Sequence, residues 1–108
     1  MSNVSEKTIN WPGQSGKQYK YTIFPIDTSF KDVPGNYIFA KETSPDKYVP
    51  IYIGQTSSFA DRFVDHHKED CARRNGATHI HAHQNSDQAS RLAEERDLIA
   101  RWNPVCNG

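Results

Sequence analysis

Runs of apolar and β-branched side chains predict strands before any other property of the chain is considered. Residues 17–26 are rich in aromatic and β-branched side chains, which favours a strand, and Pro25 favours a place at the edge of a sheet. Residues 36–41 and 49–54 form two similar runs, and the residues between them include the turn-rich Ser44-Pro45-Asp46-Lys47. Two strand-like runs around such a connection predict a β-hairpin.

The segment 78–83 alternates strictly, with Ile80 and Ala82 on one face of a predicted core strand. The other face carries three histidines: His79, His81 and His83. Side chains two apart on a strand spread along one line, which suits tetrahedral zinc poorly. We therefore expect a solvated or DNA-facing strand surface here, and not a metal site.

Two helices are predicted from capping signals. Ser58 with Asp61 three residues later resembles a capping box, and a helix to about Lys68 or beyond follows, stopped by Asn75-Gly76. Ser86-Asp87 caps a final helix that runs to about Trp102 and ends at Asn103-Pro104.

These elements together predict an α/β fold with a small, mainly antiparallel, three-stranded sheet flanked by helices. Residues 1–16 are polar with turn and breaker signals, which predicts a flexible N-terminal arm. Residues 17–108 suit a single domain, in which the segment before the hairpin adds a further edge strand as an alternative.

Glu95 is the acid that the final helix singles out. At about 100° per residue it falls inside an apolar sector, whose other members are Leu92, Leu98, Ile99 and Trp102. The opposite side, expected to be solvated, carries Glu94, Asp97 and Arg101. A carboxylate on a core-facing stripe costs free energy unless it is paired, hydrogen-bonded or bound to a cation. A salt bridge to Arg62 or Arg91 and a metal site both remain open.

Arg62 and His66 lie four residues apart, so the predicted helix presents both on one face. Arginine suits a phosphate because its planar fork makes paired hydrogen bonds, and histidine suits proton transfer near neutral pH. A solvated, charged helix edge is the alternative. Tyr37 and Tyr52 lie on the hairpin strands, and either phenol would need a nearby cation to act as a base at neutral pH.

Composition narrows the function classes only in part. The chain has 108 residues and 13 basic and 13 acidic side chains, so no overall positive field attracts it to polyanions. Cys71 and Cys106 lack CxxC spacing and the first residues do not form a secretion signal, which predicts reduced cysteines and a cytoplasmic location. No apolar run approaches the roughly 20 residues of a membrane span, so we expect no membrane role.

Several motifs now form a pattern that resembles the GIY-YIG nuclease family. Gly35-Asn36-Tyr37 and Tyr52-Ile53-Gly54 are similar to the two halves of the family signature, with Asn36 in place of the usual apolar residue. Asp61-Arg62 and then His66 stand where members place an arginine and a histidine or tyrosine. Glu95-Arg96-Asp97-Leu98-Ile99, followed by Pro104 and Asn107, looks like the metal-binding helix and its closing residues. Five elements in order are a far more specific signal than any one of them.

The resemblance, which runs from Gly35 to Asn107, implies a role for each matching residue. Glu95 would ligate one Mg²⁺ or Mn²⁺, and Arg62 would hold the scissile phosphate. Water would be positioned or deprotonated by one of three side chains, and the choice stays open: Tyr37, Tyr52 and His66. Asn107 would orient the site, and Gly54 and Gln55 would lie against substrate. Gln55 stands where members often carry a lysine, which removes one phosphate contact.

The implied function is that of a stand-alone catalytic module, similar to the N-terminal nuclease domain of the excision-repair incision subunit. We expect a metal-dependent DNA endonuclease that leaves 5′-phosphate and 3′-hydroxyl ends. Because little chain is left for a separate DNA-reading domain, recognition would depend on DNA structure or on a protein partner. The alternatives are a non-cutting GIY-YIG-fold module that binds nucleic acid or protein, and a structural protein. Acceptance of RNA and the oligomeric state stay open.

Overall fold

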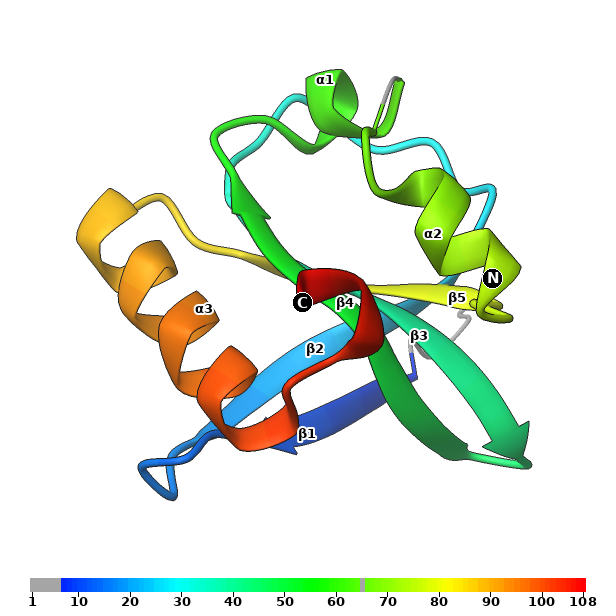
Figure 1. The fold of residues 1–108 in the computed structure, drawn as a ribbon. Helices are drawn as coiled ribbons and strands as arrows, with labels where there is room; N and C mark the ends of the chain where they lie inside the picture. The colour runs from blue at the N-terminus through cyan, green and yellow to red at the C-terminus, as the bar shows by residue number, and fades with distance from the viewer. Residues whose placement is uncertain (1–6, 65) are drawn as a thin grey trace.

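Five antiparallel strands form one curled sheet in the computed structural model, which describes residues 7–64 and 66–108 (Figure 1). Their order across the sheet is β1-β2-β5-β3-β4. The strands are β1 (Thr8–Pro12), β2 (Gln18–Pro25), β3 (Gly35–Ser44), β4 (Lys47–Thr56) and β5 (His79–Gln84). The fold is therefore α/β as predicted, but the expected three-stranded sheet is wrong, because the N-terminal part of the chain adds β1 and β2.

The N-terminal region is more ordered than its sequence predicts. Residues 8–12 of the predicted flexible arm form β1, which pairs with β2 in the register Ile9↔Tyr21 and Trp11↔Tyr19. Residues 1–6 of the arm lie outside the described residues. Trp11 holds β1 in place because its side chain is only 3% exposed. As a result β2 has neighbours on both sides, and its predicted place at the edge is wrong.

The predicted hairpin is confirmed as β3 and β4. The two strands pair from Gly35↔Thr56 to Ser44↔Lys47, with an irregularity in register between Phe39 and Ala40. Asp46 in the connecting turn adopts a φ of 63°, a left-handed conformation that aspartate tolerates better than most residues.

Helices cover both faces of the sheet (Figure 1). On one face lie α1 (Phe59–Val64) and α2 (Glu69–Arg74), and on the other lies α3 (Gln88–Trp102). The short η1 (Val105–Asn107) lies beside β4, and its Cys106 belongs to the core beneath α1 and α2. The Ser58 cap is confirmed by its hydroxyl, which accepts the Asp61 N–H at 3.2 Å. The single helix to about Lys68 is wrong, because α1 ends at Val64 and α2 begins separately. Within the described residues, no helix is both long and apolar enough to cross a membrane.

The two faces have separate cores. Beneath α1 and α2 the main buried residues are Tyr37, Phe39, Ile51, Phe59, Ala72, Ile80, Ala82 and Cys106. Beneath α3 they are Trp11, Tyr21, Ile38, Ala40, Ile53 and Leu98. The predicted alternation of β5 is confirmed, since Ile80 and Ala82 belong to the first core. His81 on the opposite face is fully buried and its Nδ1 accepts the indole N–H of Trp11 at 2.9 Å, so the expected solvated histidine surface is wrong.

The buried face of α3 differs from the predicted apolar sector. Its buried residues are Arg91, Glu94 and Leu98, whereas Leu92 is 39% exposed. Glu94, expected in solvent, is 3% exposed and its Oε2 accepts hydrogen bonds from the Tyr21 hydroxyl (2.6 Å) and from His83 Nδ1 (2.9 Å). Strand partners far away in the sequence therefore decide which acid of this helix is buried.

Cys71 and Cys106 form a disulfide that joins α2 to η1. The predicted reduced cysteines are thus wrong. A cytoplasmic location stays an untested prediction, and the oxidised pair removes the reduced-thiol argument for it, because reducing compartments rarely keep structural disulfides.

Candidate active site

Tyr37 and His66 form the buried centre of the candidate site. The Tyr37 hydroxyl and His66 Nε2 are 2.5 Å apart. The two rings pack edge to face, with their centroids 5.4 Å apart. The Tyr52 ring packs beside both: its centroid lies 6.1 Å from the Tyr37 ring centroid and 5.4 Å from the His66 ring centroid. The structure therefore brings together the three side chains among which the sequence left the choice of base open.

His66 is neutral, and its hydrogen bonds define its tautomer. Burial lowers its pKa to about 4, and the charges of His67, Arg62 and Lys68 act in the same direction. The Lys68 backbone N–H donates to Nδ1 at 2.9 Å, so Nδ1 carries no proton and Nε2–H donates to the Tyr37 oxygen. His66 thus has no free lone pair for a proton from water, and it orients the Tyr37 hydroxyl.

The position of His66 differs from the prediction that placed it on one helix face with Arg62. His66 follows the end of α1 and is 5% exposed, with its ring stacked on Phe63 at 6.1 Å. The His66 ring packs against Tyr37, Phe39 and Phe63 in place of the predicted helical position, and burial of an aromatic ring in such a cluster is favourable.

Gly54 provides the space for Tyr37. A Cβ at this position would lie 2.5 Å from the Tyr37 hydroxyl oxygen and 2.6 Å from Tyr37 Cζ, closer than any side chain tolerates. The two residues are also paired across β3 and β4. The buried glycine of the second half-motif therefore admits the tyrosine of the first half-motif.

Glu95 and Arg62 shift the pKa values of the two tyrosines in opposite directions. Burial raises the pKa of Tyr52, Glu95 raises it further, and the Tyr37 hydroxyl and Arg62 oppose this shift. For Tyr37, burial again dominates the raised pKa, Arg62 lowers it and Glu95 raises it. The charges of Arg62 and Glu95 therefore act on the same pair of phenols.

The Glu95 carboxylate is half-buried and has no salt-bridge partner among residues 7–64 and 66–108. Burial raises its pKa, and Arg62 and then Arg96 partly offset this effect. The predicted alternative of a salt bridge to Arg62 or Arg91 is therefore absent from the described part of the chain. An open hollow of about 410 Å³ adjoins Glu95 on α3, and its other lining residues are Leu92, Arg96, Ile99 and Ala100.

Such a carboxylate fits a hydrated divalent cation. Mg²⁺ keeps several waters and binds through one or two carboxylates, so one accessible acid is a sufficient protein anchor. In the described residues no group of three or more histidine, cysteine or acidic side chains gathers as a metal cage. Glu95 is the residue that would hold the ion.

Two further predicted residues, Asn107 and Gln55, make defined contacts within the protein. The Asn107 amide binds the Ile53 backbone twice, accepting its N–H at 2.8 Å and donating to its carbonyl at 2.9 Å. Asn107 therefore pins η1 to the open edge of β4, next to Tyr52 and Gly54. The Gln55 side-chain oxygen accepts a hydrogen bond from Arg91 Nε at 3.1 Å, a buried partner that sequence reasoning considered only for Glu95.

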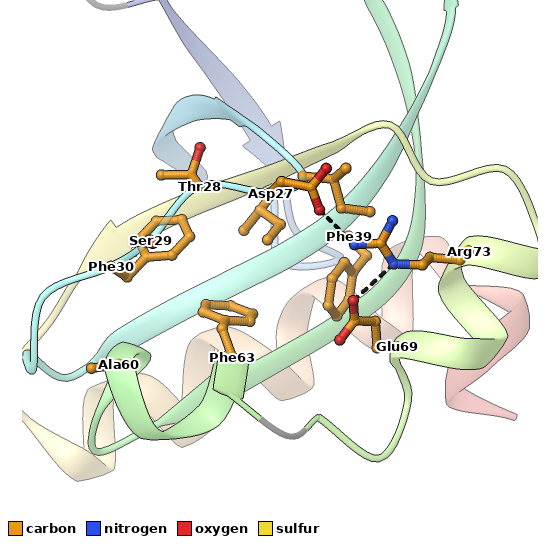
Figure 2. A pocket seen from close by; sticks show the side chains of 11 residues that line it. Asp27, Thr28, Ser29, Phe30, Phe39, Ala60, Phe63, Glu69 and Arg73 are labelled. Carbon is orange, nitrogen blue, oxygen red and sulfur yellow. Dashed lines mark hydrogen bonds and ion pairs between the residues drawn. The ribbon is translucent and has the colours of Figure 1, made fainter.

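A separate cavity of about 330 Å³ is lined in part by Phe39 and Phe63 (Figure 2). Arg73 at its rim binds Asp27 and Glu69, each at 2.8 Å. None of the predicted site residues lines this cavity. The hollow is thus a neighbour of the tyrosine and histidine cluster and not part of it.

Comparison with known proteins supports the fold directly. No family model and no curated protein matches the chain. A solved structure does: the GIY-YIG N-terminal endonuclease domain of UvrC from Thermotoga maritima bound to its catalytic magnesium has 23% sequence identity and a TM-score of 0.59, over 72% of this chain and 86% of that domain. Two tyrosine-to-phenylalanine mutants of that domain match with TM-scores of 0.57 and identities of 26% and 24%, over the same shares of both chains. The chain therefore has a GIY-YIG-like fold.

Proposed function

We propose that this GIY-YIG-like domain is a divalent-metal-dependent DNA endonuclease. The observation that carries the proposal is the packed cluster of Tyr37, Tyr52 and neutral His66, with the charges of Arg62 and Glu95 acting on both phenols. The similar UvrC domain is an endonuclease bound to a catalytic divalent cation, which supports the same chemistry here. The products would be 5′-phosphate and 3′-hydroxyl ends.

Arg62 and Glu95 have separate roles in this proposal. Arg62 would bind the scissile phosphate and stabilise the charge that builds on its oxygens in the transition state, because a fixed guanidinium offers paired hydrogen bonds. Glu95 would hold a divalent cation, which would supply a second positive charge to the phosphate group. Both charges stabilise the transition state more than the ground state, which is the condition for catalysis.

Tyr52 is the best candidate for the group that takes the proton from water. His66 has both nitrogens engaged, and burial raises the pKa of Tyr37 far above its usual range. Tyr52 is only partly buried; burial and Glu95 raise its pKa, and the Tyr37 hydroxyl and Arg62 oppose this rise. His66 and Tyr37 would then orient the Tyr52 hydroxyl.

The substrate would be DNA recognised by its structure or through a protein partner. The formal net charge is zero, so broad electrostatic attraction to duplex DNA is weak. The Gln55 amide is bound to Arg91 and offers no positive charge to a phosphate. Selection of a branched or distorted DNA, or delivery by a partner, would compensate for the weak attraction. A role in DNA repair would follow from that preference.

A cleavage assay tests the proposal. Branched and linear DNA duplexes are incubated with the protein in Mg²⁺ or Mn²⁺, with Glu95→Ala as the inactive variant and Asp70→Ala, at an exposed position of α2, as the matched surface control. We expect cutting by the parent and by Asp70→Ala, and none by Glu95→Ala. DNA binding without metal-dependent cutting would instead identify a non-cutting binding module, and neither binding nor cutting would exclude a nucleic-acid function.

A further inference from the structure

Asn36 is a polar residue in a fully buried position of β3. Its side-chain Nδ2 donates to the Arg91 carbonyl of α3 at 2.9 Å. Its Oδ1 is buried without a hydrogen-bond partner in the described part of the chain. A buried acceptor without a donor destabilises a fold, so an apolar side chain would serve stability better here.

The bond from Asn36 reaches the helical turn that ends at Glu95. In an α-helix the carbonyl of residue i accepts the N–H of residue i+4, so the Arg91 carbonyl is also the acceptor for the Glu95 N–H. The Asn36 amide and the Glu95 backbone therefore meet at one oxygen atom. Any change at Asn36 acts on the segment that determines where the Glu95 carboxylate points.

The other end of Arg91 is held from the same strand pair. Gln55 stands opposite Asn36 in the β3–β4 register, and its oxygen accepts from Arg91 Nε at 3.1 Å. Arg91 Nη1 also donates to the Asn85 carbonyl at 3.0 Å. Arg91 is only 6% exposed and has no carboxylate within salt-bridge distance among the described residues. Its backbone and its guanidinium are thus both fixed by neutral groups.

We propose that Asn36, supported by Gln55, is a positioning residue that clamps the Arg91–Glu95 turn and holds the Glu95 carboxylate where it binds the divalent cation. This inference rests on the proposed function. Outer residues that orient a metal ligand commonly change metal affinity about 10- to 100-fold when they are replaced. The unpaired oxygen of Asn36 indicates that the residue serves this purpose at the expense of stability.

The test compares Asn36→Leu with His81→Leu. Both exchanges replace a fully buried polar side chain on the α3 face that has one unpaired atom in the described structure, but His81 binds Trp11 and not α3. Mn²⁺ affinity is measured by electron paramagnetic resonance titration, and stability by thermal unfolding without metal. We expect Asn36→Leu to unfold at or above the parent temperature and to bind Mn²⁺ about tenfold more weakly. His81→Leu should bind Mn²⁺ as the parent does.

Parent affinity in a folded Asn36→Leu variant would overturn the proposal, and so would a loss of affinity matched by an equal loss in His81→Leu. A weaker affinity that accompanies a lower unfolding temperature would also overturn it, because the role would then be structural. If Asn36→Leu does not fold, Gln55→Met answers the question. It removes the acceptor of Arg91 Nε at similar length and should weaken Mn²⁺ binding, whereas parent affinity would refute the clamp.

The two proposals fail in different ways. The parent protein must bind Mn²⁺ and lose this binding in Glu95→Ala for the proposed metal site to stand. If that condition holds and Asn36→Leu is unaffected, only the positioning role is lost. If the parent does not bind Mn²⁺ through Glu95, the proposed function itself is refuted, and the clamp with it.

Discussion

Glu94 and Glu95 are adjacent acids on α3, and their replacement by alanine should have opposite consequences. Glu94 is 3% exposed and accepts two hydrogen bonds, from the fully buried Tyr21 and from His83. Glu95 is half-buried and has no salt-bridge partner in the described residues. We therefore expect Glu94→Ala to destabilise the fold and Glu95→Ala to leave it stable but inactive.

The expected loss in Glu94→Ala follows from its contacts. A hydrogen bond to a charged group contributes about 1.5–3 kcal/mol, and the Tyr21 hydroxyl would be left buried without an acceptor. The side chain of His83 is 31% exposed, so solvent weakens that interaction and we add at most about 1 kcal/mol for it. The free energy of unfolding should fall by about 2–4 kcal/mol, which lowers the unfolding temperature of a domain of this size by roughly 10–20 °C.

The assay is urea unfolding followed by tryptophan fluorescence, with DNA cleavage measured under native conditions. Glu95→Ala should stay within about 0.5 kcal/mol of the parent, as is usual for a site without a defined partner, yet lose cleavage. Glu94→Ala molecules that remain folded should still cut DNA. The reasoning is refuted if Glu94→Ala is as stable as the parent, or if Glu95→Ala loses as much stability as Glu94→Ala.

Three further predictions follow from the same contacts. Burial lowers the pKa of His66 to about 4 and of His81 to about 3, both below the unfolded value near 6.5, so each stabilises the fold fully above pH 6.5 and less as pH falls toward 4. Urea unfolding between pH 7 and 4.5 should show the decline, approaching about 1.4 kcal/mol per pH unit for each histidine, and His81→Leu should make it shallower. Reduction of the Cys71–Cys106 disulfide, which spans 35 residues, should lower the free energy of unfolding by about 3–4 kcal/mol, and the Cys71→Ser/Cys106→Ser variant should not respond to reductant. Arg62→Ala should slow cleavage by roughly 10²-fold or more, with Mn²⁺ still bound through Glu95. Arg62→Lys should recover only part of the rate because a lysine lacks the planar fork. A cleavage rate in Arg62→Ala equal to that of the parent would contradict the phosphate role.

Local signals were sufficient for much of the fold. The hairpin, the alternation of β5 and the Ser58 cap each depend on residues close together in sequence, and all are present. The misses depend on distant partners. β1 forms because β2 offers it an edge, and Glu94 is buried because Tyr21 and His83 supply hydrogen bonds that a helical wheel does not contain.

The predictions for the candidate site divide in the same way between local signals and distant partners. Tyr37, Tyr52 and His66 were selected by motif spacing, and the structure brings their rings together. The tautomer of His66 depends on the Lys68 backbone N–H, and the clamp of Arg91 depends on two strands, so neither was visible from spacing alone. The disulfide was missed because its two thiols share no local motif.

The position of β5 in the sheet has a practical meaning for where the domain starts. The motif residues run from Gly35 to Asn107, yet β5 has β2 as one of its two neighbours, and His81 on β5 depends on Trp11 for its hydrogen bond. A fragment that contains only the motif residues would leave β5 without a paired strand on one side. It would also leave the buried His81 imidazole without its hydrogen-bond donor, Trp11. We therefore expect the smallest unit able to fold alone to include β1 and β2 as well as the motif residues, so that fusion or truncation boundaries belong before β1.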